Sequence, residues 1–134
     1  MQKEIIHNWY FSQSPQEVWE YLTKPELIEQ WLMETDFQPI AGHKFRFTCS
    51  TIIYCEVLEI ITNKLLSYSW QAKNENGGIT VDSKVTWTLL EKDGGTELKL
   101  VHNGFTTLED YVGHNSAWTT IGNKFVELLN TIKT

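Results

Sequence analysis

The sequence predicts an α+β fold in which an antiparallel sheet of about six strands curves around one long C-terminal helix, with two short helices after the first strand. Most of the chain alternates apolar and polar residues with a period of two, which is typical of strands with one buried face. The segment from Asn115 to Lys133 has the 3.6-residue period of a helix instead, with apolar side chains at Trp118, Ile121, Phe125, Leu128, Leu129 and Ile132. Such a stripe is buried by packing against a sheet.

The first third of the chain predicts one strand and then two short helices. Residues 4–11 are rich in β-branched and aromatic side chains, which favours a strand. Ser14 and Glu17 form a Ser-x-x-Glu capping box around a proline suited to the first helical position. Pro25 opens a second helix with Leu27, Ile28 and Trp31 on its apolar side, before a loop at Glu34-Thr35-Asp36.

The middle of the chain predicts strands joined by short turns. Alternating residues indicate one strand from about residue 43 and further strands over residues 54–61, 65–72 and 83–91. The last strand carries Leu98, Leu100 and His102 on its inner face. Because Asn and Gly residues occupy the turns, we expect an antiparallel meander, with Cys49 and Cys55 as small apolar strand residues.

Composition argues against several functions. The formal net charge is −6 and the 11 Lys and Arg residues are spread singly, whereas nucleic acid and anionic membranes need clustered cations. No apolar run approaches the roughly 18 to 20 residues of a membrane span, and the charged N-terminus is unlike a secretory leader. Because the chain has no internal repeat, we expect a single domain over residues 1–134. Because it has only two cysteines and no disulfide framework, we expect a cytoplasmic location.

No motif indicates catalysis, a cofactor or a metal. Cys49 and Cys55, taken with His43 or His102, lack the spacing of a zinc site. The chain has no Gly-x-Ser-x-Gly elbow and no Gly-rich phosphate loop. We therefore predict no catalytic residue, no cofactor and no bound metal.

Aromatic residues suggest an apolar pocket instead, because 17 side chains are Trp, Tyr or Phe and six of these are Trp. Such rings fill a core or line a ligand cavity, and large flat rings leave gaps where they pack. His102 either bonds a backbone carbonyl at the end of the sheet or, with Tyr68, orients a ligand. The predicted ligand-contacting residues are Trp9, Tyr68, Trp70, Trp87, His102, Phe105, Trp118, Ile121, Gly122 and Phe125.

Two features near the last helix allow several structures. Gly122 lets the sheet approach the helix, leaves room in a cavity, or is a tolerated surface glycine. Thr107-x-x-Asp110 resembles a capping box, which allows a short helical turn or an earlier start of the long helix. Otherwise the segment is a connector, in which Tyr111 and His114 are candidates for a lid over the ligand.

In this order and spacing the motifs resemble the activator of heat-shock-protein-90 ATPase homologue-like proteins, within the START/Bet v 1-like helix-grip superfamily. The resemblance covers nearly the whole chain and implies a helix-grip fold. Relatives often place Gly immediately before the helix Trp, whereas Ala117 stands there in this sequence. The matching motifs are Ser14-Pro15-Gln16-Glu17-Val18-Trp19, Leu22-Thr23-x-Pro25-Glu26-x-Ile28-x-x-Trp31, Glu56-Val57-Leu58-Glu59-Ile60, Leu66-x-Tyr68-x-Trp70, Val85-Thr86-Trp87-x-Leu89, Gly95-Thr96-x-Leu98-x-Leu100-x-His102-x-Gly104-Phe105 and Trp118.

The resemblance implies three possible functions. We favour the binding of a small, mainly hydrophobic molecule between the sheet and the C-terminal helix. The second is a protein-interaction module that contacts a chaperone, as the family's namesake does, although the eukaryotic namesake carries an additional domain for chaperone binding. The third is an enzyme of the polyketide cyclase or aromatase type, which requires polar cavity groups beyond His102.

Overall fold

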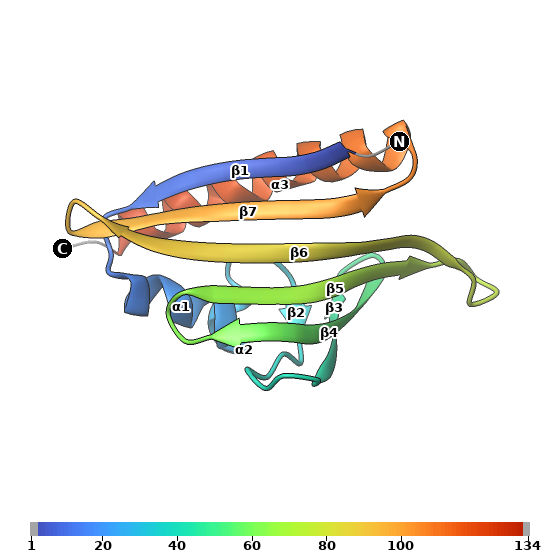
Figure 1. Cartoon of the computed structure of the whole chain (residues 1–134), viewed down its shortest axis with the longest axis horizontal. Helices are drawn as coiled ribbons and strands as arrows, with labels where there is room; N and C mark the ends of the chain where they lie inside the picture. Colours follow the sequence, from blue (N-terminus) through green and yellow to red (C-terminus); the bar gives the residue numbers. More distant parts are fainter. Residues whose placement is uncertain (1–2, 133–134) are drawn as a thin grey trace.

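The computed structural model describes residues 3–132, in which seven antiparallel strands form one sheet beside three helices (Figure 1). The sheet order is β1-β7-β6-β5-β4-β3-β2, so the first strand joins the end of a meander by pairing with β7. This confirms the predicted α+β fold. The elements are β1 (Lys3–Phe11), α1 (Pro15–Thr23), α2 (Pro25–Ile28), β2 (Glu34–Thr35), β3 (Lys44–Thr48), β4 (Ile52–Ile61), β5 (Leu65–Lys73), β6 (Ile79–Lys92), β7 (Gly95–Phe105) and α3 (Leu108–Thr131).

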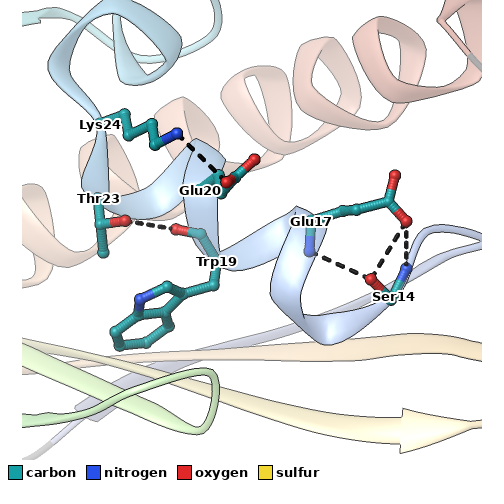
Figure 2. Close-up of polar contacts among 6 residues, drawn as sticks. All are labelled: Ser14, Glu17, Trp19, Glu20, Thr23 and Lys24. Atoms are coloured by element: carbon teal, nitrogen blue, oxygen red, sulfur yellow. Dashed lines mark hydrogen bonds and ion pairs between the residues drawn. The ribbon is translucent and has the colours of Figure 1, made fainter.

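Helix α1 begins at the predicted capping box (Figure 2). The Ser14 hydroxyl accepts from the backbone N–H of Glu17 at 3.2 Å, and the Glu17 carboxylate accepts from the backbone N–H of Ser14 at 3.2 Å. At the other end the Thr23 hydroxyl donates to the carbonyl of Trp19 at 2.8 Å. The two bonds at Ser14 satisfy backbone N–H groups that a helix start leaves without partners. Tyr21 of α1 lies 6.2 Å from Phe125, which places the short helices beside the C-terminal half of the long helix.

The long helix α3 runs along β1 and β7, with α1 and α2 near the end of the sheet where β1 stops and β7 starts (Figure 1). It begins at Leu108, because the Thr107 hydroxyl caps it by accepting from the N–H of Asp110 at 3.1 Å. The earlier of the predicted starts is therefore correct. Tyr111 and His114 belong to the helix and not to a loop.

Several other bounds correct the sequence prediction. Strand β2 occupies Glu34–Thr35, where a loop was expected, because these residues pair with β3. Strand β6 starts at Ile79 and is longer than expected because it pairs with the whole of β5. Cys49 lies beyond the end of β3 and is exposed, whereas Cys55 is buried in β4 as expected. Ile132 is exposed because α3 ends at Thr131, and Lys133 lies outside the described residues.

Candidate ligand-binding site

Aromatic rings fill the space between the sheet and the C-terminal half of α3. Phe125 of α3 stacks on Trp31, which follows α2, with ring centroids 4.0 Å apart. Trp87 of β6 meets Trp31 edge to face at 5.9 Å, and Phe11 of β1 lies 4.8 Å from Phe125. All four side chains are buried. This half of the interior is a packed core.

A buried hydrogen-bond chain centred on His102 lies closer to the N-terminus of α3. The indole N–H of Trp118 donates to His102 Nδ1 at 2.9 Å. Because that nitrogen accepts, Nε2 carries the proton and donates to the Ser83 hydroxyl at 2.8 Å. Ser83 in turn donates to the backbone carbonyl of Trp70 at 2.8 Å. Each of these polar groups is thus paired inside the protein.

Both ring nitrogens of His102 are thus hydrogen-bonded within the protein, and Nε2 meets a hydroxyl where a backbone carbonyl was one of the expected partners. As predicted, it points inward beside Phe105, at a ring distance of 4.6 Å. Burial, with a smaller effect from His114, lowers the pKa of His102 to about 3. The imidazole is neutral at physiological pH, and both ring nitrogens are already hydrogen-bonded.

A second pair joins the sheet to the first turns of α3. The indole N–H of Trp70 donates to Nε2 of His114 at 3.3 Å. Nδ1 of His114 donates to the backbone carbonyl of Asp110, one turn earlier, at 2.8 Å. His114 also packs against Phe105 at 4.9 Å. The pair fixes both rings as a wall at this end of the helix.

An open apolar pocket of about 420 Å³ lies beside this wall, between the N-terminal half of α3 and the turn joining β3 to β4. Its volume falls within the range of small-molecule sites. The residues that line it are Met33, Cys49, Thr51, Ile53, Trp70, Glu109, Asp110, Gly113, His114, Ala117, Trp118 and Ile121. Apolar atoms make up most of its surface. It is the best candidate for a ligand site.

A somewhat larger hollow, of about 460 Å³, lies over β3, β4 and β5. Polar and charged residues, among them Lys44, Arg46, Glu56 and Lys73, form much of its lining. Lys73 already lies over the Tyr54 ring, 4.1 Å from its centroid. This hollow lacks the apolar walls typical of a small-molecule site.

The ten predicted site residues fall into two groups. Three of them line the pocket: Trp70, Trp118 and Ile121. The other seven lie in the surrounding interior: Trp9, Tyr68, Trp87, His102, Phe105, Gly122 and Phe125. Tyr68 is typical of the second group, because its hydroxyl accepts from the Trp87 indole at 2.9 Å and burial raises its pKa.

Gly122 brings the sheet close to the helix, which was one of its three predicted roles. A Cβ atom at this position would lie 2.2 Å from Cζ2 of Trp9 in β1. The missing side chain thus lets the indole of Trp9 pack on the helix. Trp9 also stacks on His7 at 5.4 Å, and Nε2 of His7 lies 2.9 Å from the Asn115 side-chain oxygen.

Sequence reasoning missed several pocket residues. Met33, Cys49 and Thr51 come from loops, which give no periodic signal. His114 and Ala117 precede Trp118 and Ile121 by four residues each, which is helical spacing. The helix predicted from Asn115 already included Ala117, and its earlier alternative start adds His114 to the same face.

A curved antiparallel sheet that holds one long helix, with an apolar pocket beside that helix, defines a helix-grip protein. The family model described as activator of Hsp90 ATPase homolog 1-like protein matches residues 12–130. The chain belongs to this family, as its motifs indicated. No curated protein sequence matches it.

Solved structures support the assignment. The crystal structure of protein MLL2253 from Mesorhizobium loti is 32% identical, with a TM-score of 0.91 over 98% of this chain and 100% of that one. DynU16, a putative protein in the dynemicin biosynthetic locus, is 19% identical, with a TM-score of 0.84 over 97% of this chain and 48% of its own. The Aha1 dimer from Colwellia psychrerythraea is 18% identical, with a TM-score of 0.78 over 95% and 96%. The last two similarities show the fold alone.

No helix within residues 3–132 is long and apolar enough to cross a membrane.

Proposed function

We propose that this protein binds a small, mainly hydrophobic molecule in the pocket between α3 and the β3–β4 turn. The observation that supports this function is an open pocket of about 420 Å³ whose surface is mostly apolar, with indole and aliphatic side chains in its wall. A well-packed interior normally fills such a space with its own side chains. Here the space opens to solvent, which gives a ligand access.

Trp70, Trp118 and Ile121 are the proposed ligand contacts among the residues predicted from sequence. Two of the remaining seven, His102 and Gly122, support these contacts from behind. Trp118 is held by His102, and Gly122 sets the distance between α3 and β1. The pocket therefore has a rigid inner wall and a more exposed rim, which lowers the entropic cost of binding.

Two other functions have weaker support. A cyclase or aromatase needs polar groups that reach a substrate, but both ring nitrogens of His102 are paired inside the core. A chaperone-associated module is suggested only by the family's description. We place the protein in the cytoplasm because a reducing compartment suits its free thiols, one of which, Cys49, is exposed at the pocket.

Binding of Nile red, a neutral dye that fluoresces in apolar surroundings, tests the proposal. Ala117 is an exposed residue of the pocket, so Ala117→Phe adds a ring that fills the space without entering the core. Thr120→Phe is the matched control, because Thr120 is exposed on α3 and does not line the pocket. We expect Ala117→Phe to weaken dye binding about tenfold or more, equivalent to about 1.4 kcal/mol, and Thr120→Phe to leave it unchanged.

Thermal unfolding should be similar for both variants, since neither residue is buried. Absence of dye binding to the unaltered protein would contradict the proposal. Equal loss of binding in the two variants would contradict it as well. Native mass spectrometry of the purified protein offers an independent measurement, because a tightly held ligand adds a discrete mass that Ala117→Phe should remove.

A further inference from the structure

The aromatic wall of the pocket offers no free ring N–H within the described residues, because its ring N–H groups already bond to the protein. The indole N–H of Trp118 donates inward to His102, and that of Trp70 donates to His114. The N–H of His114 donates to the backbone carbonyl of Asp110. A ligand carboxylate or phosphate, which can only accept, therefore finds no ring N–H that it can use without breaking one of these bonds.

The rim of the pocket carries hydrogen-bond acceptors with negative charge. Glu109 and Asp110 line the pocket, while none of its twelve lining residues is Lys or Arg. The Asp110 carboxylate accepts from the Thr107 hydroxyl at 2.9 Å, and within the described residues neither carboxylate forms an ion pair. The N-terminus of α3 contributes a positive dipole of only about half a charge, which two carboxylates outweigh. The rim is thus electronegative.

His114 adds no free acceptor, because its Nε2 already takes the N–H of Trp70 at 3.3 Å. The Thr51 hydroxyl can donate or accept, so it favours neither kind of ligand. The two rim carboxylates are therefore the groups that distinguish between ligands, and they favour a head group that donates hydrogen bonds.

We infer that the ligand of this pocket has an apolar body and a head that donates hydrogen bonds, such as a hydroxyl or an ammonium group, and that the pocket rejects carboxylates. This inference rests on the proposed function, since it concerns the same site. It narrows the class of ligand to neutral or cationic amphiphilic molecules, and it excludes fatty-acid anions.

Competition against Nile red by three molecules that share one apolar chain tests the inference. The competitors are 1-decanol, decylammonium and decanoate, each below its critical micelle concentration, at pH 7.5 and low salt. We expect 1-decanol and decylammonium to displace the dye, and decanoate to bind about tenfold or more weakly than 1-decanol. Added salt should narrow this difference, because it screens exposed charges.

Two double variants, each of which removes two negative charges, distinguish the effect of the rim carboxylates from the effect of the protein's net charge. The double substitution Glu109→Gln and Asp110→Asn should strengthen decanoate binding several-fold, because it removes both carboxylates from the rim. The control is Glu91→Gln with Glu97→Gln, which makes the same change in net charge on β6 and β7, outside the pocket. The control should leave decanoate binding unchanged.

The outcomes are distinct for the two proposals. If Nile red fails to bind, the proposed function is wrong. If Nile red binds and decanoate competes as well as 1-decanol, only the inference about the head group is wrong. An equal gain of decanoate binding in both double variants would also overturn it, because the repulsion would then come from net charge and not from the rim.

Discussion

The two halves of α3 meet the same sheet but produce different interiors. Around Phe125, the segment after α2 supplies Trp31, and Tyr21 of α1 adds a second ring 6.2 Å from Phe125. Around Trp118, the opposite wall is formed by Met33, the β3–β4 turn and Ile53 of β4, and a pocket stays open. The position of the short helices decides which half is filled. The number of aromatic rings does not decide it, because both halves are rich in them.

The two halves also differ in how their rings are held. Trp31 and Phe125 are parallel and stacked, with an interplanar angle of 8°. Trp118 and Trp70 are instead tied to histidines through their N–H groups. Trp31 of the filled half also donates its indole N–H, to the backbone carbonyl of Tyr21 at 2.9 Å. Both halves therefore combine packing with hydrogen bonds, and the open half differs in that its indoles bond to histidine side chains.

Truncation of Trp31, in the filled half, has the largest expected effect on the free energy of unfolding. Trp31→Ala removes a ring that is 2% exposed and leaves the Tyr21 carbonyl without its indole donor. We expect the free energy of unfolding to fall by about 3–5 kcal/mol, measured by urea denaturation. Ile121→Ala in the open half should cost only about 1 kcal/mol, because a half-buried side chain loses less contact. Equal losses would show that both halves are packed alike.

Gly122 tests how closely the sheet and helix must approach. Gly122→Ala places a methyl group against Trp9, and overpacking of this kind costs about 1–3 kcal/mol. The better helix propensity of Ala offsets about 1 kcal/mol of that loss. Gly113→Ala is the control, because its Cβ would meet nothing within 4 Å, and it should gain stability. If urea denaturation showed an equal gain in the free energy of unfolding for both variants, the close contact between Gly122 and Trp9 would be refuted.

Much of the fold was predictable because its signals are local. The period of two, the capping box at Ser14 and the turn residues each act within a few positions of the chain. Strand β2 was missed because Glu34 and Thr35 become a strand only by pairing with β3. The sequence left two possible starts for α3, because its first turns, with Leu108 and Val112 exposed, lack the buried stripe of the later ones.

The site was predictable only in part. Helical and strand spacing place Trp70 and Trp118 on inner faces, which the structure confirms. Whether an inner ring fills a core or borders a cavity depends on Trp31 and on the β3–β4 turn, which approach through tertiary packing. Local pattern holds no information on that approach, so Phe125 and Trp70 were indistinguishable in the sequence although they lie in different surroundings.

His102 makes the stability of the open half depend on pH. Its pKa falls from an ordinary value of 6.5 to about 3 in the folded state, so the unfolded chain binds a proton that the folded protein excludes. This contribution to stability is complete above pH 6.5 and is lost as the pH falls toward 3, at about 1.4 kcal/mol per pH unit. His102→Gln does not titrate, and its amide can bond to both Ser83 and Trp118.

The measurement is the difference in unfolding free energy between the unaltered protein and His102→Gln from pH 7 to pH 4. The other titrating groups are present in both proteins, so the difference reports on position 102. It should shrink as the pH falls, because only the unaltered protein loses the histidine contribution. A difference that stays constant over this range would show that His102 is not held neutral by burial.

Substitution of the two helix caps has the smallest expected effect on stability, and it distinguishes the two halves of α3 by their effect on dye binding. Ser14→Ala and Thr107→Ala each remove an N-cap oxygen, and each should lower the free energy of unfolding by about 1 kcal/mol. Ser14 caps the helix beside the filled half, whereas Thr107 caps the turns that carry Glu109 and Asp110 at the pocket. Thr107→Ala should therefore also weaken Nile red binding, and Ser14→Ala should not. Equal dye affinities in the two variants, at matched stability, would mean that the first turn of α3 does not shape the pocket.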